Sequence, residues 1–306
     1  MNDLVIIGAG PAGATASVYA ARKQLKTILV TESWGGQSSV STDIRNWIGT
    51  KSISGADLAK SFEEHAKECE GEFLRFIEGE RVESVSKNGE TFSVHITNGE
   101  TIETRALLIA TGSHRRKLDI PGAAELDNKG VMYCASCDGP VFTDLHVGVV
   151  GGGNAAIEAV IELAQYCKSV TLFHRRTEFK ADKITTEKAF AKENVINMSP
   201  VDLVELKGDG MLETVVYKNK ETGEMGEKNL AGLFVEIGLI PTTGFVKDIV
   251  TVNEIGQIKI DPLTQKTETD GIWAAGDCTN VLYHQNNIAA GDGVVAIEDI
   301  YRTLNS

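Results

Sequence analysis

The chain is patterned as short, continuous apolar runs that are separated by glycine or polar residues. Runs of this length that are apolar throughout indicate strands buried on both faces, as in parallel sheets. The clearest predicted strands lie at residues 3–7, 26–31, 106–110, 147–150, 169–173, 232–235 and 271–277. The pattern therefore favours an α/β protein built around parallel sheets.

Helical periodicity follows two of these strands directly. One predicted helix begins near Ala12, and a second covers residues 154–164, where apolar residues recur at helical spacing. After each strand–turn–helix segment come strand-like stretches that suggest a small antiparallel layer. These stretches lie at residues 82–85, 92–96, 201–206 and 214–217. The order of elements thus repeats, and the repeat predicts two related units.

The first strand–helix turn reads Gly8-Ala9-Gly10-Pro11-Ala12-Gly13. Glycines at this spacing allow a tight turn, close approach of the backbone to a pyrophosphate, and packing of the helix on the strand. Free amides at the helix start attract the phosphates. Glu32 ends the next strand, where an acid would bind a ribose 2′-hydroxyl. The unit is predicted to bind FAD or NAD; the alternative is a close-packed turn without a ligand.

The second turn, Gly151-Gly152-Gly153-Asn154-Ala155-Ala156, repeats the first with one change. The strand that follows ends in His174-Arg175-Arg176, with Lys180 four residues later, instead of an acid. Cations can hold a 2′-phosphate, and arginine suits phosphate geometry. The second unit is therefore predicted to prefer NADPH over NADH. The alternative is a solvated basic patch.

Cys134 and Cys137 form a Cys-x-x-Cys pair between the two units. Such a pair is either a redox disulfide or half of a zinc site, and a structural zinc needs further ligands at recognisable spacing. Cys69, Cys167 and Cys278 stand alone, so no metal site is expected. Two unused thiols would be a third interpretation. Asp138 favours redox chemistry because its carboxyl group is placed to exchange a proton with a thiolate.

Composition narrows the function classes. The chain has 306 residues, of which 42% are hydrophobic, and two domains of this size can each hold a core. The net charge of −13 argues against nucleic acid or an anionic membrane as partner. The sequence predicts neither a membrane span nor a signal peptide. Five cysteines with one close pair indicate a reducing compartment, and a cytoplasmic location is expected.

Together these motifs resemble those of the low-molecular-weight thioredoxin reductases over essentially the whole chain. The resemblance also rests on Gly35-Gly36-Gln37, Asn46-Trp47, Ala110-Thr111-Gly112 and Ala274-Ala275-Gly276-Asp277. The chain is similar as well to the C-terminal part of the flavoprotein subunit of alkyl hydroperoxide reductase. That relative normally carries an extra N-terminal thioredoxin-like segment, and the chain is expected to lack one because it begins at the FAD motif.

The resemblance implies a homodimeric FAD enzyme with two Rossmann-like, three-layer dinucleotide-binding domains, the second inserted into the first. Residues 1–116 and 246–306 would bind FAD, and residues 117–245 would bind NADPH and carry the dithiol. Electrons would pass from NADPH to FAD, then to the disulfide, then to thioredoxin or a thioredoxin-like protein. Because dithiol and nicotinamide would compete for the flavin, the resemblance implies rotation of the inserted domain.

The resemblance also implies individual contacts. Gly35, Gly36, Gln37 and Asn46 would line the flavin, while Asp277 and Gln285 would hold the ribityl-pyrophosphate and ring side. The remaining residues expected at FAD are Gly8, Gly10, Ala12, Gly13, Glu32, Val82, Ala110, Thr111, Gly112, Gly276, His284 and Asn286. Those expected at NADPH are Gly151, Gly153, Asn154, Ala155, Ala156, His174, Arg175, Arg176 and Lys180.

The chain departs from the family pattern at three places. Lys180 stands where the family usually has arginine, which keeps the charge but loses the forked geometry. His284 replaces an arginine that often precedes the glutamine, and Asn286-Asn287 replaces a more apolar pair.

An NADPH-dependent thioredoxin-disulfide reductase is the predicted function. One alternative keeps the fold but uses ferredoxin or NADH as donor, or serves a peroxiredoxin system. Another is a nucleotide-sensing binding module with a structural Cys-x-x-Cys.

Overall fold

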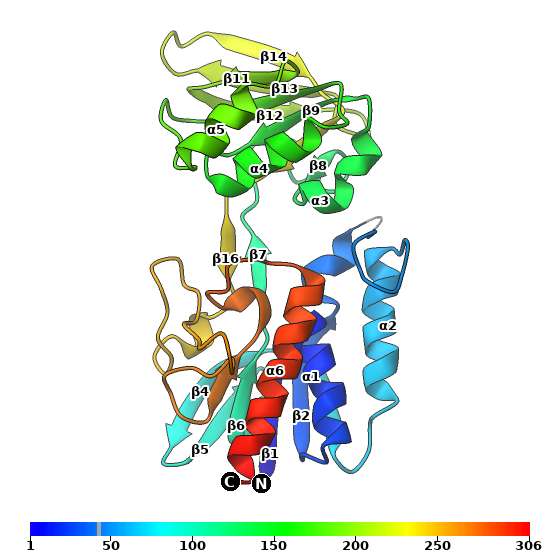
Figure 1. The fold of residues 1–306 in the computed structure, drawn as a ribbon, viewed down its shortest axis with the longest axis vertical. Coiled ribbons are helices and arrows are strands. Elements are labelled where there is room, and N and C mark those ends of the chain that lie inside the picture. The colour runs from blue at the N-terminus through cyan, green and yellow to red at the C-terminus, as the bar shows by residue number, and fades with distance from the viewer. Residues whose placement is uncertain (42–43) are drawn as a thin grey trace. The chain divides into compact units, whose positions relative to one another are not determined.

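The computed structural model describes residues 1–41 and 44–306. The chain divides into two compact units, the first formed by residues 1–114 and 240–306 and the second by residues 115–239 (Figure 1). The second unit is thus one continuous segment inserted into the first. The sequence-based expectation places the boundaries slightly later, after residues 116 and 245.

The chain passes from one unit to the other within two short strands, β7 (Ser113–Arg115) and β16 (Leu239–Pro241). These strands pair with each other as a two-stranded sheet. Flanking hydrogen bonds extend the pairing, from Arg116 N to Gly238 O at 3.0 Å and from Thr242 N to Gly112 O at 3.0 Å. Both boundaries between the units therefore lie inside these paired strands, between His114 and Arg115 in β7 and between Leu239 and Ile240 in β16.

The first unit is built on a seven-stranded sheet in the order β3-β2-β1-β6-β5-β4, with β17 also paired to β6. β1, β2, β3, β6 and β17 are parallel, whereas β5 is antiparallel to both β4 and β6. The strands are β1 (Asn2–Ala9), β2 (Thr27–Trp34), β3 (Leu74–Glu78), β4 (Val82–Asn88), β5 (Thr91–Ile96), β6 (Thr101–Ile109) and β17 (Ile272–Ala274). The predicted second strand runs on to Trp34, so Glu32 lies inside β2 rather than at its end.

Both faces of this sheet are covered. On one face α1 (Pro11–Arg22) lies beside α6 (Asn286–Leu304), and their alanine-rich sides share a core with Leu4, Ile6 and Leu108 (Figure 1). α2 (Gly55–Lys67) also packs on α1. On the other face Phe92 and Val94 belong to a second core with residues 245–260. The predicted antiparallel stretches at residues 82–96 therefore form the β4–β5 edge of the main sheet.

The second unit has a five-stranded sheet in the order β11-β10-β9-β15-β8, parallel throughout, and a separate antiparallel sheet β12-β13-β14. The parallel strands are β8 (Val131–Met132), β9 (His146–Val150), β10 (Ser169–Phe173), β11 (Val195–Met198) and β15 (Gly232–Val235). The antiparallel strands are β12 (Val201–Lys207), β13 (Thr214–Asn219) and β14 (Met225–Asn229). The helices are α3 (Ala135–Asp138), α4 (Asn154–Leu163) and α5 (Lys183–Phe190).

The periodicity that predicted a helix at residues 154–164 corresponds to α4. Its apolar side buries Ala156, Ile157 and Val160 in a core with Val147 and Val149 of β9. The predicted α/β class is confirmed, and each of the two units has the strand–turn–helix start that the glycine motifs require. Within the described part of the chain, no helix is both long and apolar enough to cross a membrane.

Candidate active site

The first unit encloses a cavity of about 690 Å³ at the carboxyl ends of β1 and β6. This volume lies in the range of cofactor sites, about 300–1,000 Å³. Residues of the glycine turn between β1 and α1 form one part of its wall, and Ala110, Thr111 and Gly112 after β6 form another. The cavity therefore opens where open α/β sheets bind their ligands.

Each glycine of the first turn has its own steric reason. Gly8 has φ +102°, and a Cβ on it would lie 2.5 Å from the carbonyl oxygen of Ala110. A Cβ on Gly13 would lie 1.8 Å from the carbonyl oxygen of Gly8. Gly10, by contrast, has only the Cα of Gly36 near its Cβ position, at 3.9 Å, and lines the cavity. Gly8 and Gly13 thus permit the turn, while Gly10 leaves room for a ligand.

The start of α1 fits the pyrophosphate of FAD. Gly10 is the N-cap and provides no side chain to occupy the first amides, and no acidic residue stands in the first turn. Free amides at a helix N-terminus bind anions. The open space over Gly10, the uncapped helix and the cavity volume together match a dinucleotide, so the residues present fit FAD.

Glu32, the acid expected to bind a ribose, lines this cavity and is already paired. Arg81 donates to both of its carboxylate oxygens, Nε to Oε2 at 2.7 Å and Nη2 to Oε1 at 2.6 Å, which lowers the pKa of Glu32. Both side chains line the cavity next to Glu80 and Val82. A ribose hydroxyl would therefore share Glu32 with Arg81. Sequence reasoning missed Arg81 because no local pattern connects it to Glu32, which lies 49 positions away in the chain.

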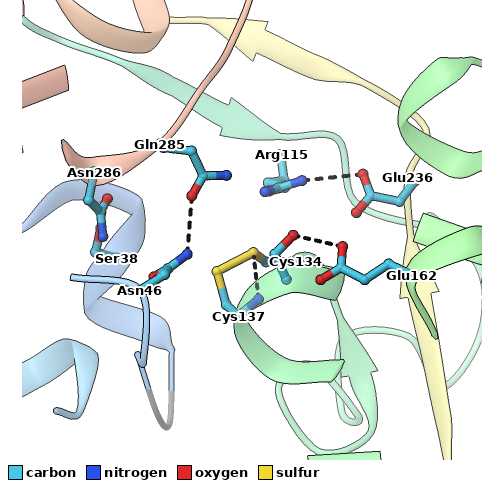
Figure 2. Close-up of a disulfide and its surroundings, with 10 residues drawn as sticks. Ser38, Asn46, Arg115, Cys134, Cys137, Glu162, Glu236, Gln285 and Asn286 are labelled. Atoms are coloured by element: carbon cyan, nitrogen blue, oxygen red, sulfur yellow. Dashed lines mark hydrogen bonds and ion pairs between the residues drawn. A yellow bond between two sulfur atoms is a disulfide. The ribbon is translucent and has the colours of Figure 1, made fainter. Parts of the chain in front are cut away.

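Polar side chains tie η1 (Gly36–Val40) and the segment after it to the start of α6. Ser38 Oγ donates to Asn286 Oδ1 at 2.6 Å, and Asn46 Nδ2 donates to Gln285 Oε1 at 3.1 Å (Figure 2). Asn287 completes the connection, because its Nδ2 donates to Asn46 O at 2.7 Å and its Oδ1 accepts from Ile48 N at 3.3 Å. The asparagine pair that departs from the family pattern therefore joins two distant segments of the first unit.

Most residues expected at FAD lie in the cavity wall. The lining includes Gly8, Gly10, Ala12, Glu32, Gly36, Gln37, Val82, Ala110, Thr111, Gly112, Gly276, Asp277 and Asn286. It also includes residues that sequence reasoning did not name, among them Ser38, Ser39, Glu80, Arg81, Thr242 and Phe245. Gly13, Gly35, Asn46, His284 and Gln285 are not part of the lining. Gly13 supports the turn, and Asn46 and Gln285 bond to each other.

The second glycine turn, between β9 and α4, also approaches other backbone closely. Gly151 has φ +156°, and a Cβ on it would lie 2.3 Å from the carbonyl oxygen of Glu236. Gly153 is the N-cap of α4, has no capping side chain, and leaves its Cβ position open. The Asn154 side chain accepts from Asp182 N at 2.8 Å and so holds the following loop. The open helix start is again suited to a phosphate.

The basic cluster after β10 divides into one buried and three exposed residues. His174 is 8% exposed, its Nε2 lies 3.0 Å from Glu178 O, and burial lowers its pKa. Its ring also fills the space beside Gly152. Arg175, Arg176 and Lys180 are exposed, and none forms an ion pair within residues 1–41 and 44–306. His174 thus supports the turn, while its expected contact with nucleotide stays a prediction.

Cys134 and Cys137 are joined in a disulfide at the start of α3. Cys134 is the N-cap of this helix, and its sulfur accepts from Cys137 N at 3.2 Å. Ser136, between the two cysteines, donates to Glu162 Oε2 of α4 at 2.8 Å. The predicted disulfide is confirmed. No group of three or more His, Cys, Asp or Glu side chains among the described residues is arranged to hold a metal ion.

Asp138 follows the disulfide directly and is only 5% exposed. Its Oδ1 is buried and has no hydrogen-bond partner among the described residues. Burial raises the pKa of Asp138 to about 6, against the opposing charge of Arg115. A carboxyl group with such a pKa can both donate and accept a proton near neutral pH.

Arg115 also pairs with Glu236, an acid that sequence reasoning did not single out. Arg115 Nη1 lies 3.3 Å from Glu236 Oε2, and the side chain of Glu236 is only 10% exposed (Figure 2). Burial raises the pKa of Glu236 to about 7, Arg115 opposes the shift, and Glu162 adds to it. The second unit thus holds one buried acid, Asp138, and one largely buried acid, Glu236, that share one arginine.

Two dinucleotide folds, one inserted into the other and carrying a disulfide, define the class of flavin- and pyridine-nucleotide-linked disulfide oxidoreductases. Residues 2–293 match the family model described as pyridine nucleotide-disulphide oxidoreductase, and the chain belongs to this family. The family implies FAD and a pyridine nucleotide as cofactors.

Curated relatives include "NADH dehydrogenase" of Bacillus subtilis (strain 168), which is 37% identical over 96% of this chain and 57% of its own length. An alkyl hydroperoxide reductase subunit of Escherichia coli (strain K12) is 36% identical over 96% of this chain and 56% of its own length. The chain therefore spans little more than half the length of the curated relatives it matches.

Solved structures match over nearly their full length. The thioredoxin reductase from Streptococcus pyogenes MGAS5005 is 35% identical, with a TM-score of 0.90 over 100% of this chain and 98% of that chain. The thioredoxin reductase from Giardia duodenalis is 34% identical, with a TM-score of 0.91 over 100% of this chain and 99% of that chain. These likenesses confirm the predicted fold and the family resemblance.

Proposed function

We propose that this chain is a FAD-dependent disulfide reductase that passes electrons from NADPH to the disulfide of thioredoxin or a thioredoxin-like protein. The observation that carries the proposal is the Cys134–Cys137 disulfide, followed directly by the buried acid Asp138. The similarity to solved thioredoxin reductases over nearly their whole length supports it. In this proposal the first unit binds FAD and the inserted unit binds NADPH.

The residues of the inserted unit would supply the disulfide chemistry. FAD, when bound, supplies a carrier that can accept two electrons from a pyridine nucleotide and release them to a disulfide. Addition of two electrons breaks the bond between Cys134 and Cys137 and leaves two thiolates. Asp138 would give a proton to one of them, because a thiolate in a partly buried site is costly.

Transfer to the partner would then reverse these events. One thiolate attacks a sulfur of the partner disulfide and displaces the other partner sulfur, which gives a mixed disulfide. The second cysteine of the pair, whose proton Asp138 would take back, attacks the mixed disulfide. This attack releases the reduced partner and restores the Cys134–Cys137 bond. By family resemblance Cys137 would lie nearer the flavin, and either cysteine could be the one that exchanges.

NADPH is the proposed donor because Arg175, Arg176 and Lys180 are exposed and form no ion pair among the residues of the described chain. They could therefore hold a 2′-phosphate without first breaking another interaction. A homodimer is the proposed assembly, by resemblance to the family. The cytoplasmic location expected from the cysteine pattern remains part of the same proposal.

A second candidate function is NADH-dependent reduction of a peroxiredoxin-type partner. The specific observation in its favour is the identity of 36% to the alkyl hydroperoxide reductase subunit of Escherichia coli. The partner chemistry is the same disulfide exchange, so the two candidates differ in donor and partner rather than in the relay.

An anaerobic titration of the purified protein tests the proposal. NADPH, NADH and reduced ferredoxin are added separately while flavin absorbance is followed, and oxidised thioredoxin or peroxiredoxin is then supplied. We expect NADPH to bleach the flavin and thioredoxin to be reduced. Cys134→Ser should keep the bleaching and abolish thioredoxin reduction, whereas Cys69→Ser, at a free cysteine of the first unit, should change neither. A Cys134→Ser variant with full turnover would contradict the relay.

A further inference from the structure

Glu236 lies at the carboxyl end of β15 in the second sheet, the edge at which open α/β sheets generally bind their ligands. β15 is parallel to β9, with Val235 opposite Val150, and Glu236 N continues the pairing by donating to Val150 O at 2.9 Å. Gly151, the first residue of the glycine turn, follows β9 directly and packs against the Glu236 backbone. The carboxyl ends of these two adjacent strands therefore present the glycine turn and Glu236 side by side.

The order of strands gives the direction of a bound dinucleotide. β9 is flanked by β10 on one side and by β15 on the other. The exposed cations Arg175 and Arg176 follow β10, so the adenosine phosphate would lie on that side, and the pyrophosphate would lie at the start of α4. The nicotinamide half must then extend across β9 toward the carboxyl end of β15, where Glu236 is the first residue beyond the strand.

At the carboxyl end of β15, Arg115 offers hydrogen-bond donors and the Glu236 carboxylate offers acceptors. The Arg115 side chain is 30% exposed and has five N–H donors, of which one makes the 3.3 Å contact to Glu236. Among the described residues, Arg115 is the only side chain that the structure gives as a hydrogen-bond partner of the Glu236 carboxylate. A carboxamide group needs the opposite set, because its oxygen accepts and its NH₂ donates.

A purely structural role explains the pair poorly. A largely buried ion pair loses solvation that its attraction barely repays, and apolar residues of similar volume are often as stable. The burial that raises the pKa of Glu236 to about 7 reports this cost. A ligand that hydrogen-bonds to both members would give such a pair a function.

We propose that Arg115 and Glu236 are specificity-determining residues that recognise the carboxamide of the nicotinamide ring. Arg115 donates to the carboxamide oxygen, and the Glu236 carboxylate accepts from the carboxamide nitrogen. This inference rests on the proposed function, since it assigns the nicotinamide half of the pyridine nucleotide to these residues.

The assignment is tested by measuring, with calorimetry, the equilibrium binding of three probes to the FAD-loaded protein. NADP⁺ carries the carboxamide, its 3-acetylpyridine analogue keeps the carbonyl but lacks the NH₂, and adenosine 2′,5′-bisphosphate lacks the ring altogether. We expect NADP⁺ to bind about tenfold more tightly than the analogue, because a hydrogen bond to a charged group is lost. Glu236→Leu should remove this difference and leave adenosine 2′,5′-bisphosphate binding unchanged.

Three further variants separate recognition from folding. The double variant Arg115→Leu with Glu236→Leu removes both charges of the pair and should also bind the two nucleotides equally, with circular dichroism as the check that it is folded. Glu227→Leu removes the partner of Lys207 in another ion pair of the second unit, 2.8 Å long, and should keep the tenfold difference. Arg175→Ala with Arg176→Ala should weaken all three probes while NADP⁺ remains favoured over the analogue.

The outcomes distinguish this inference from the proposed function. If the unaltered protein binds neither adenosine 2′,5′-bisphosphate nor any pyridine nucleotide, the proposed function fails. If it binds NADP⁺ and the analogue equally, or if Glu236→Leu and the double variant retain the difference, the assignment of Arg115 and Glu236 is wrong while the proposed function stands. Should NAD⁺ bind instead of NADP⁺, its own 3-acetylpyridine analogue gives the same comparison.

Discussion

At the residue scale, the acid beside the disulfide has an environment that is unusual for a carboxyl group. Asp138 is buried and lacks a hydrogen-bond partner for Oδ1 among the described residues. Burial raises its pKa, and the charge of Arg115 offsets only part of this rise. An aspartate placed merely to turn the chain would normally keep its oxygens hydrated or bonded to backbone amides. The environment of Asp138 therefore favours a proton-transfer role.

Asp138→Asn should reduce dithiol–disulfide turnover by at least about tenfold, since general acid–base catalysis contributes about 10²–10⁴ in rate. Asparagine keeps the shape and the turn but cannot exchange the proton. FAD content and NADPH binding, measured by absorbance and calorimetry, should stay normal. Unchanged turnover with an unchanged pH profile would return the proton-transfer role to water.

The same substitution should change the pH dependence of stability. The folded-state pKa of Asp138 is raised from 3.8 to about 6, so the stability linked to its neutral form is present below pH 3.8 and lost as pH rises through 6. Asp138→Asn escapes this loss, and its free energy of unfolding should exceed that of the unaltered protein by about 3 kcal/mol at pH 7. Urea denaturation of both proteins at pH 4 and at pH 7 measures this difference in the free energy of unfolding. A difference that is no larger at pH 7 than at pH 4 would contradict the burial argument.

The exposed cations after β10 should set the donor preference. Each charge-assisted contact to a 2′-phosphate is worth about 1.5–3 kcal/mol, so even one gives NADPH a preference of about tenfold or more. Arg175→Ala with Arg176→Ala should bring kcat/KM for NADPH down to that for NADH. Lys192→Ala, at a partly exposed lysine beyond α5, serves as the control for a general loss of positive charge. Equal kcat/KM for both nucleotides in the unaltered protein would exclude the preference.

At the scale of elements, the first strand–turn–helix separates folding from ligand binding. Gly13 allows α1 to pack on the turn, because a Cβ there would lie 1.8 Å from Gly8 O. Gly10 has open space over its Cβ position and faces the cavity. The two glycines of one turn therefore have different physical roles.

Gly13→Ala and Gly10→Ala should consequently differ in effect. Gly13→Ala must displace backbone, so we expect loss of about 1–3 kcal/mol of stability in the FAD-free protein. Gly10→Ala should leave the Tm of the FAD-free protein unchanged but weaken FAD binding, since the added methyl group occupies the space left for a ligand. Thermal unfolding with and without FAD separates the two. If Gly10→Ala retained normal FAD affinity, the pyrophosphate would not lie over this residue.

At the scale of the whole molecule, the inserted unit is a continuous segment with its own cores. Residues 115–239 contain two buried apolar clusters, and the strands where the segment begins and ends lie together in one two-stranded sheet. A domain with its own core and adjacent ends can fold alone.

A fragment of residues 115–239 should therefore fold cooperatively and bind adenosine 2′,5′-bisphosphate. The complementary first unit, joined by a short glycine linker between residues 114 and 240, should bind FAD. Circular dichroism melting and calorimetry check both fragments. A fragment of residues 115–239 that remains unfolded would show that its stability depends on the rest of the chain.

Local sequence determined the elements, the two glycine turns and the cysteine pair. Apolar runs report strands buried on both faces, and glycine spacing reports a turn that excludes side chains, so both signals are contained in a few neighbouring residues. The placement of Cys134 next to Cys137, and of Asp138 after them, is likewise a local property. These signals suffice for the α/β fold and for the chemical class of the site.

Only the tertiary structure decided which polar side chains meet. Arg81 reaches Glu32 across 49 positions, Arg115 reaches Glu236 across 121, and Asn287 reaches Asn46 across 241. Each pairing depends on strand order and on the path of the chain between units, which no local pattern encodes. The burial of His174 beneath the second turn, rather than its exposure beside Arg175, has the same origin. Charge and hydrogen-bonding type are properties of the residue, whereas partner and burial are properties of the fold.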